Sequence, residues 1–425
     1  MSPVSILFLV FAVALIIGVP FIWAMMLSCL CAAFAMGTVP LTFFAQRMFT
    51  GGEKYVFLAI FFFLLAGAIM QHGGISKRLV AFAKAWFGHM TGGLSIVVLI
   101  ACMFFAALCG SNVATVVAIG SMLYPELIKA GYPKGYAAAL PTVGGTLGIV
   151  IPPSIVFVVY GSTVNTSISK LLISGIGPGV LGGVAMCLYA YYYAKRHNLP
   201  KADRFDLGTA LAATRDAFWA LLMPLIILGG IYSGIFTPTE SAAVAVLYGL
   251  IVAFFYKSLS FGHLARIMVT AVEGTANILL LIMAATVFGW VLTANGFPTA
   301  FNQALSQFIH DKTTFLLCLN VMLLVLGMLM DTGPIILIIA PLIYPVAMKF
   351  GIDPVHLGCI VVFNLSVGQA TPPFGLCLFA SSGVTGQSIM ALSKNSLPFI
   401  IVLYGCVLLT SFIPAISTGL LVFMN

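Results

Sequence analysis

The feature that most constrains this chain is a series of long runs that are apolar on every side. The run VFLAIFFFLLAGAIM at 56–70 is one of several. A membrane helix needs about 20 apolar residues to cross a hydrocarbon core about 30 Å thick. Only 7% of the 425 residues are charged, against about 25% in an ordinary soluble protein. The runs predict an all-α polytopic membrane protein. They exclude a soluble enzyme and also an outer-membrane barrel, whose strands would alternate apolar and polar residues.

The charged residues mark topology rather than a binding surface. The net charge is +8, and the basic residues are dispersed singly or in pairs. Such dispersal is typical of the positive-inside rule and not of a nucleic-acid site. The nine cysteines are scattered without a CxxC pair, so neither a disulfide framework nor a metal cluster is indicated. The run at 1–21 has no basic n-region, and its A-x-A sequence at 12–14 lies inside the apolar run instead of after it, so we expect the run to be the first spanning helix.

The chain contains an internal repeat. Its one extended polar stretch, 195–216, lies near the midpoint, and the two halves match at an offset of 220 residues. That offset superimposes Tyr124-Pro125 on Tyr344-Pro345, Gly131 on Gly351, Gly148 on Gly368, Pro152-Pro153 on Pro372-Pro373 and Pro178 on Pro398. Glycines and prolines at one fixed offset imply that both copies break their backbones at the same places. We therefore expect a first repeat at 1–194, a cytoplasmic connector at 195–216 and a second repeat at 217–425.

The uneven distribution of cations indicates that the two repeats are inverted. The central block of the first copy carries Lys77, Arg78, Lys84, Lys129 and Lys134, whereas the matching region of the second has only Lys312 and Lys349. By the positive-inside rule the first block is cytoplasmic and the second is not. We predict five crossings and one re-entrant hairpin in each copy, with both termini outside. Inverted repeats with broken helices are typical of secondary transporters.

Four interruptions are expected to carry the chemistry. They are GSNVAT at 110–115, PTVGGTLGIVIPPS at 141–154, MDTGP at 330–334 and SVGQATPPF at 366–374. Glycine allows close backbone approach and Pro-Pro ends a helix, so half-helices should meet there. Amino ends suit a carboxylate, while unwound carbonyls suit sodium. The side chains at these breaks are oxygen donors, which hard cations prefer: Ser111, Asn112, Thr115, Thr146, Asp331, Thr332, Ser366, Gln369 and Thr371. Small residues can also serve only helix packing, but four breaks in register favour an ion and substrate site.

Three acids lie in apolar surroundings. Asp331 is at a repeat break, so we assign it to the second hairpin tip near a sodium site. Glu240 follows Thr237-Pro238, a helix-start signal, and a capping or interfacial role is equally compatible with its position. Glu273 lies near a cytoplasmic boundary and is compatible with a structural role.

Several stretches together resemble one known family. They are FAQRMFTGGEKYVFLAIFFFLLAGAIMQHGGISKRLV at 44–80, GYAAALPTVGGTLGIVIPPSIVFVVYG at 135–161, TPTESAAVAV at 237–246, LGMLMDTGPIILIIAPLIYPV at 326–346 and GQATPPFGLCLF at 368–379. Over essentially its whole length the chain resembles the large membrane subunit (M subunit, DctM-like) of TRAP transporters, the tripartite ATP-independent periplasmic systems. The resemblance implies a bacterial inner-membrane carrier of the elevator type that is not an enzyme. Its partners would be a separate four-helix Q subunit and a periplasmic substrate-binding protein.

The resemblance also implies how the chain is divided and where its ligands bind. Scaffold helices would occupy about 1–72 and 217–266, and transport elements about 90–170 and 312–390. Sodium, the coupling ion, would bind at Ser111, Asn112, Gly145, Thr146 and Gly148 in one copy and at Asp331, Thr332, Gly333, Gly368 and Thr371 in the other. Substrate would contact Ser111, Thr115, Pro153, Ser154, Gln369 and Pro373. No other cofactor is implied.

The cargo is an organic acid. The family moves C4-dicarboxylates, sialic acid and other sugar acids, keto acids and sulfonates, and this chain resembles the sialic acid branch most. No Arg or Lys lies near the four breaks in the sequence, which favours a hydroxyl-rich monocarboxylate, so sialic acid (N-acetylneuraminate) is the prediction. The alternatives are a C4-dicarboxylate TRAP permease and a stand-alone sodium/carboxylate symporter of similar architecture. An intramembrane enzyme would need an HExxH, paired-aspartate or Ser-His motif, and the sequence has none.

Overall fold

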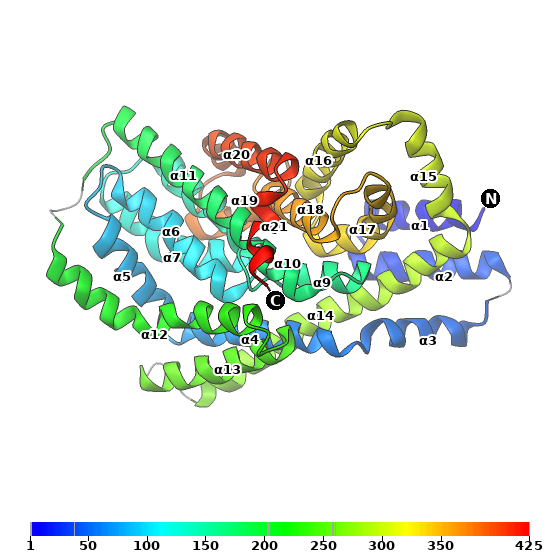
Figure 1. Ribbon diagram of the computed structural model, residues 1–425, viewed down its shortest axis with the longest axis horizontal. Helices are drawn as coiled ribbons and strands as arrows, with labels where there is room; N and C mark the ends of the chain where they lie inside the picture. The colour runs from blue at the N-terminus through cyan, green and yellow to red at the C-terminus, as the bar shows by residue number, and fades with distance from the viewer. Residues whose placement is uncertain (1, 38, 202–204, 257–258, 260, 425) are drawn as a thin grey trace.

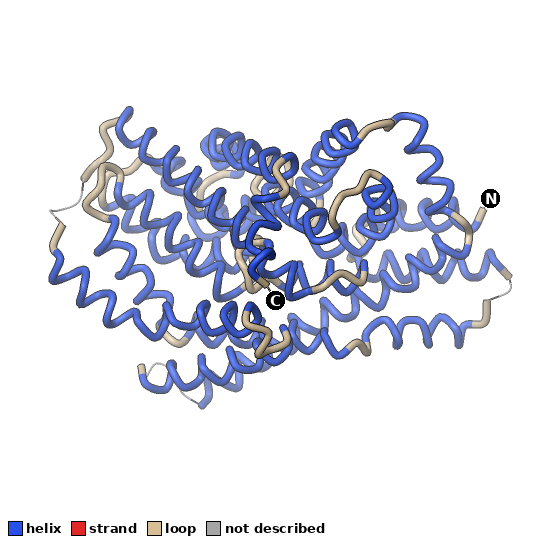
Figure 2. The backbone as a smooth tube through the Cα atoms, viewed as in Figure 1, coloured by secondary structure: helices blue, strands red, loops and turns tan. Residues whose placement is uncertain are grey.

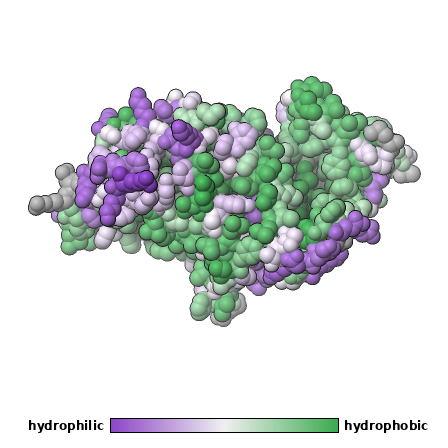
Figure 3. Space-filling view, turned by 90° about the horizontal axis from the view of Figure 1, so that it is seen from above, coloured by the Kyte–Doolittle hydropathy of each residue, from purple (hydrophilic) through white to green (hydrophobic). Residues whose placement is uncertain are grey.

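The computed structural model describes residues 2–37, 39–201, 205–256, 259 and 261–424, and this part of the chain is almost entirely helical (Figure 2). Among the described residues, eight helical segments are long and apolar enough to cross a membrane. In the face shown in Figure 3, hydrophilic residues gather toward the two ends and a broad hydrophobic region lies between them. The prediction of an all-α, multi-span protein is confirmed.

The described residues of the first half form eleven helices and two short 3-10 turns. In chain order they are α1 (Pro3–Ile16), α2 (Phe21–Met36), α3 (Leu41–Gly52), η1 (Tyr55–Phe57), α4 (Leu58–His72), α5 (Ile75–Phe87), α6 (Gly93–Cys109), α7 (Asn112–Lys129), α8 (Lys134–Gly145), η2 (Thr146–Ile149), α9 (Ile155–Val164), α10 (Ile168–Ser174) and α11 (Ile176–Arg196).

The second half repeats much of this order. Its elements are α12 (Leu207–Tyr232), α13 (Pro238–Phe255), α14 (Phe261–Ala294), α15 (Phe297–Phe308), α16 (Lys312–Leu329), α17 (Thr332–Lys349), α18 (Pro354–Gly368), α19 (Leu376–Thr385), α20 (Ile389–Phe412), α21 (Ala415–Thr418) and η3 (Gly419–Phe423). Since α11 ends at Arg196 and α12 begins at Leu207, the expected connector is helical at both ends. Residues 202–204 within it lie outside the described part.

The repeat is visible in the helix boundaries. α7 and α17 begin and end 220 residues apart, and so do the starts of α8 and α18. The pairs α6–α7 and α16–α17 form the two helical hairpins, and each is followed by a broken helix, α8–η2–α9 or α18–α19. The diprolines inside the two breaks are both cis. Both copies therefore interrupt their helices at the glycines and prolines that the sequence offset had matched.

The two copies differ at the helix that faces the hairpins. α14 is a single helix of 34 residues, whereas its counterpart is broken into α3 and α4, which lie beside it (Figure 1). The first copy has Gly51-Gly52 where the second has Ala271-Val272, and glycine costs a helix about 1 kcal/mol more than alanine. The helix of the second copy is therefore continuous from Phe261, while the first copy has a fifth interruption at 53–57. Residues 257, 258 and 260, just before α14, lie outside the described part.

The copies interlock through their broken helices. α9 of the first copy packs against α17 of the second, and α19 of the second packs against α7 and α8 of the first. α14 contacts both α4 and α17, and α4 contacts α6. Each hairpin therefore also packs against α4 or α14. This arrangement brings the four predicted breaks to the middle of the molecule.

Glu240 caps the start of α13, which is one of the two roles predicted for it. The Thr237 hydroxyl accepts a hydrogen bond from the Glu240 amide at 3.3 Å, and the Glu240 carboxylate accepts one from the Thr237 amide at 2.8 Å. This reciprocal pair is a capping box, which satisfies two otherwise unpaired amides.

Candidate functional site

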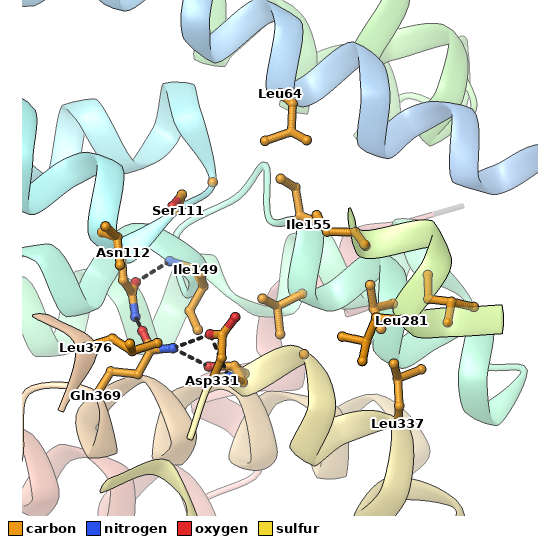
Figure 4. A pocket seen from close by; sticks show the side chains of 18 residues that line it. Leu64, Ser111, Asn112, Ile149, Ile155, Leu281, Asp331, Leu337, Gln369 and Leu376 are labelled. Carbon is orange, nitrogen blue, oxygen red and sulfur yellow. Dashed lines mark hydrogen bonds between the residues drawn. The ribbon is translucent and has the colours of Figure 1, made fainter. Parts of the chain in front are cut away.

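A cavity of ≈ 210 Å³ lies where the two hairpin tips and the two breaks converge (Figure 4). Its far walls come from α4, through Leu64, and from α14, through Ile278, Leu281 and Ile282. Most of its lining is apolar. The polar side chains on its wall are Ser111, Asn112, Asp331, Thr332 and Gln369.

Gln369, the residue after α18, connects the cavity walls. Its Nε2 donates hydrogen bonds to Asp331 Oδ1 and to Thr332 Oγ1, both at 2.8 Å. Its Oε1 accepts from Asn112 Nδ2 at 2.7 Å. These interactions are drawn in Figure 4. One buried amide therefore joins the second break to the tips of both hairpins.

Asn112, the first residue of α7, extends this network into the first break. Its Oδ1 accepts from the Ile149 amide at 2.9 Å, and its Nδ2 also donates to Ser366 Oγ at 2.9 Å. Ser366 Oγ in turn donates to the carbonyl of Thr146. Asn112, Thr146 and Ser366 are buried. Because buried polar groups are costly unless paired, this network fixes how one repeat sits against the other.

The site is symmetric in position but not in chemistry. At the offset of 220, Ser111 corresponds to Asp331, Asn112 to Thr332 and Ile149 to Gln369. Only the second tip therefore has a carboxylate and only the second break a side-chain amide. Within the described residues no group donates a hydrogen bond to Asp331 Oδ2, and Asp331 is exposed on the cavity wall. A cation is best held on this side of the cavity.

Both hairpins direct a helix amino end at the cavity. Ser111 caps α7, accepting from the Ala114 amide at 3.4 Å, and Asp331 caps α17, accepting from the Thr332 amide at 2.7 Å. Helix amino ends carry partial positive charge, and their free amides suit an anion. The site can therefore offer hydroxyl and carboxylate oxygens to a cation and helix ends to an anion.

Glycines let the breaks contact the hairpins through their backbones. A Cβ on Gly148 would lie 2.4 Å from the Ser111 carbonyl oxygen, and one on Gly145 would lie 2.2 Å from Val116 Cγ2. In the other copy, a Cβ on Gly368 would lie 2.7 Å from Gly327 Cα. These positions cannot accept a larger residue without moving a hairpin.

The remaining predicted residues are divided between the cavity and the layer behind it. Gly333 lines the cavity, while the buried Thr146 and Thr371 donate their hydroxyls to the carbonyls of Val143 and Val367. Of the predicted substrate residues, only Ser111 and Gln369 are on the wall. Thr115 is buried and donates to the Ser111 carbonyl at 2.7 Å, Ser154 caps α9, Pro153 is buried behind Gly110 and Pro373 is exposed.

Sequence reasoning missed two cationic residues. A second cavity of ≈ 330 Å³ has Arg47 and Lys54 on its wall, and it shares Val159, Ile282 and Leu337 with the first. No Arg or Lys lies near the four breaks along the sequence, but these two cations adjoin the cavity in space. They lie at the fifth interruption, 53–57, which was not recognised in the sequence. The signal that could have found it was Gly51-Gly52 followed by Glu53-Lys54 inside an apolar region.

Known proteins match the chain over most of its length. The model of the DctM component of tripartite ATP-independent periplasmic transporters matches residues 8–416. The isethionate TRAP transporter permease protein DctMQ of Oleidesulfovibrio alaskensis is 42% identical over 98% of this chain, which spans 66% of that longer protein. The C4-dicarboxylate TRAP transporter large permease protein DctM of Pseudomonas aeruginosa is 43% identical over 88% of each chain. The sialic acid TRAP transporter large permease protein SiaM of Vibrio cholerae is 33% identical over 93% of each chain.

Solved structures share the fold at low sequence identity. The Alcanivorax borkumensis YdaH transporter superimposes with a TM-score of 0.67 at 16% identity, covering 89% of this chain and 88% of that one. MtrF of Neisseria gonorrhoeae gives 0.61 at 12% identity, covering 88% and 83%. The chain therefore belongs to the DctM component family of tripartite ATP-independent periplasmic transporters, whose members are permeases of the bacterial inner membrane and not enzymes.

Proposed function

We propose that this permease carries a small organic anion together with sodium, and that both bind between the two hairpin tips. The observation that carries the proposal is the network through Gln369, because it places a carboxylate, hydroxyls and two helix amino ends around one cavity. Sodium is a hard cation that takes oxygen ligands. The anion balances the amino ends of α7 and α17.

Asp331 is the centre of the proposed second sodium site. Its Oδ2 has no donor among the described residues, and the Thr332 hydroxyl lies on the same wall. In the first copy Ser111 takes the place of the carboxylate, so the first sodium would rely on hydroxyl and carbonyl oxygens of the tip and of the break at Gly145, Thr146 and Gly148. The two sites would then differ in affinity, the one with the carboxylate being the stronger.

The size and surroundings of the cavity favour a small cargo. Drug-sized ligands occupy pockets of about 300–1,000 Å³, and the cavity at the tips is ≈ 210 Å³. A four-carbon diacid or a two-carbon sulfonate suits that volume better than sialic acid, which is a nine-carbon sugar acid. The relatives named for isethionate and for C4-dicarboxylates have the higher identities, 42% and 43%, against 33% for the sialic acid permease. We therefore propose a C4-dicarboxylate or small sulfonate in place of sialic acid.

The carrier would work by moving one group of helices past another. The hairpins and broken helices, at about 90–170 and 312–390, would form the transport domain. The helices at about 1–72 and 217–266, extended by the rest of α14, would form the scaffold. In support, the two groups meet through several small helix contacts, of which α14 with α17 and α4 with α6 are the most extensive. A periplasmic binding protein would deliver the anion, and a separate Q subunit would complete the complex.

Reconstitution tests the proposal. The permease, its small subunit and its binding protein are placed in liposomes, and uptake of labelled succinate, isethionate and sialic acid is followed with and without an inward sodium gradient. We expect uptake of succinate or isethionate only with the gradient and only with the binding protein. Uptake without sodium would contradict the coupling. Uptake without the binding protein would support a stand-alone symporter, and uptake of sialic acid alone would restore the sequence-based prediction.

A further inference from the structure

The second cavity lies at the break between α3 and α4. It is lined by Arg47, Thr50, Gly51 and Lys54 and faces α9, α14 and α17. Because Val159, Ile282 and Leu337 line both cavities, the second adjoins the one between the hairpin tips. In the topology predicted from the charges, α3 enters from outside, and the parts of α9 and α17 on this wall lead outward from the breaks. The second cavity therefore lies on the outer side of the first.

The local sequence explains why two cations share this wall. Arg47, Thr50 and Gly51 have the spacing of one face of α3. That face is held against α14, since a Cβ on Gly51 would lie only 2.5 Å from Thr286 Oγ1. Lys54 follows the end of α3 in extended backbone, which turns its side chain toward α9.

Arg47 and Lys54 both line the second cavity, and both are exposed on its wall. Lys54 Nζ donates to the Ser162 carbonyl at 2.9 Å and approaches Ser162 Oγ at 3.5 Å, both at the outer end of α9. The Arg47 guanidinium lies over the ring of Phe43, 5.0 Å from its centroid, and Phe43 packs against Trp290 at 4.8 Å between centroids. A lysine that merely reached the membrane surface would extend away from the apolar wall instead.

In the described part of the chain no acid forms an ion pair with Arg47 or Lys54. The ion pairs among the described residues are Arg78 with Asp216 and Lys84 with Glu126, so Arg47 and Lys54 have no carboxylate within 4.0 Å. Glu53, their neighbour in sequence, does not line the cavity. Because Arg47 and Lys54 are exposed on the cavity wall, an anion that enters the cavity can reach both of them. The group that pairs best with two such cations is an anion with several oxygens, such as a carboxylate or a sulfonate.

We propose that Arg47 and Lys54 form a second anion subsite, which holds the acid group of the cargo on the outer side before the cargo passes between the hairpin tips. The proposal rests on the proposed function in one respect, that the cargo is an organic anion. Arg47 offers a fork of N–H donors, and Lys54 retains a donor beyond those that face Ser162. A dianion can thus be attracted by this subsite although the tips themselves provide no cationic side chain.

Sulfate binding tests the subsite independently of the cargo. Sulfate replaces chloride at constant ionic strength, and tryptophan fluorescence of the purified permease is followed, because Trp290 contacts the ring on which Arg47 lies. We expect a saturable signal that is absent from a Trp290→Phe variant. It should weaken about tenfold in Arg47→Gln or Lys54→Gln, which corresponds to about 1.4 kcal/mol, and should disappear in the double variant. Lys349→Gln, at the exposed end of α17, is the matched control and should bind as the wild type does. Absence of the signal from the wild type, or its persistence in the double variant, would overturn the proposal.

Transport measurements distinguish a failure of the anion subsite from a failure of the proposed function. In the full complex at saturating sodium, the double variant should raise the KM for succinate or isethionate at least about tenfold while leaving the half-saturating sodium concentration unchanged. The charge-preserving pair Arg47→Lys and Lys54→Arg should keep most of the affinity, which distinguishes charge from folding. If the wild type transports neither anion, the proposed function fails and the sulfate titration still decides the subsite. An unchanged KM in the double variant contradicts the subsite alone.

Discussion

Replacing Gln369 with leucine is the sharpest test of the network between the hairpin tips. The change keeps a similar volume but removes three hydrogen bonds, one of them to a carboxylate. Net contributions are about 1 kcal/mol for a neutral hydrogen bond and about 1.5–3 kcal/mol for one to a charged group, so the site loses about 3–5 kcal/mol of interactions that orient Asp331, Thr332 and Asn112. If a third of this loss is felt in sodium binding, the half-saturating sodium concentration rises about tenfold.

The assay is sodium-dependent uptake by the reconstituted complex, measured across a range of sodium concentrations, together with the melting temperature of the purified variant. Gln387→Leu is the matched control, because Gln387 is half-buried away from the cavity and its side chain donates one hydrogen bond, to the Tyr124 hydroxyl at 3.3 Å. We expect Gln369→Leu to shift the sodium dependence and Gln387→Leu to leave it unchanged. Wild-type sodium dependence in Gln369→Leu, with the protein folded, would refute the assignment of the ion site to this network.

Three further predictions follow from the same geometry. Asp331→Ala should strongly weaken sodium-dependent uptake while the complex still assembles on size exclusion; wild-type uptake would return Asp331 to a purely structural role as the cap of α17. Gly148→Ala should abolish uptake and lower the melting temperature, because its Cβ would meet the Ser111 carbonyl at 2.4 Å. Gly229→Ala is the control and should be tolerated, because its Cβ would have nothing within 4 Å. Equal behaviour of the two variants would contradict the close contact at Gly148. Hydrogen bonds from Thr314, chiefly from its hydroxyl, lower the pKa of the exposed Asp311 carboxyl below its ordinary 3.8. The ionised Asp311 therefore stabilises the fold above about pH 4, and this stabilisation is lost as the pH falls through the lowered pKa. The difference in melting temperature between the wild type and Asp311→Ala should shrink on acidification and be constant from pH 6 to 8.

The sequence predicts the backbone of the site better than its side-chain pairing. Glycine and proline have strong local effects, so their common offset predicts that Asn112 and Thr332 begin equivalent helices. The hydrogen-bond partners of the Asn112 side chain could not be predicted in this way. Gln369 and Ser366 belong to the other copy, and no repeat offset tells how one copy packs on the other. Local patterns therefore predict the tips and the breaks, while the link between them appears only in three dimensions.

Arg47 and Lys54 were missed for a related reason. A repeat comparison looks for breaks that both copies share, and the break at 53–57 is present in only one of them, because Gly51-Gly52 replaces Ala271-Val272. The two cations are also far from every other site residue in the sequence. They meet the site only because α9 and α17 of different copies pack together beside α3 and α14.

The central claim is that the hairpins move past the scaffold helices as they carry their ligands. Gly67 of α4 and Cys109, the last residue of α6, meet across this boundary: a Cβ on Gly67 would lie 2.9 Å from Cys109 Cα and 3.2 Å from Cys109 Cβ. Disulfides join Cβ atoms about 3.5–4.5 Å apart, so in Gly67→Cys the two helices must move apart slightly before the new thiol bonds the native Cys109, which is free; uptake by the reduced variant is therefore the baseline. Gly67→Cys in a Cys109→Ser background has the same bulk and cannot form this bond.

The most direct measurement is uptake by the reconstituted Gly67→Cys permease before oxidation, after oxidation and after reduction. The account predicts that uptake falls in proportion to the fraction cross-linked, returns on reduction, and is unaffected by oxidant in the Cys109→Ser background. Full uptake by completely cross-linked protein would contradict movement of the first hairpin against α4.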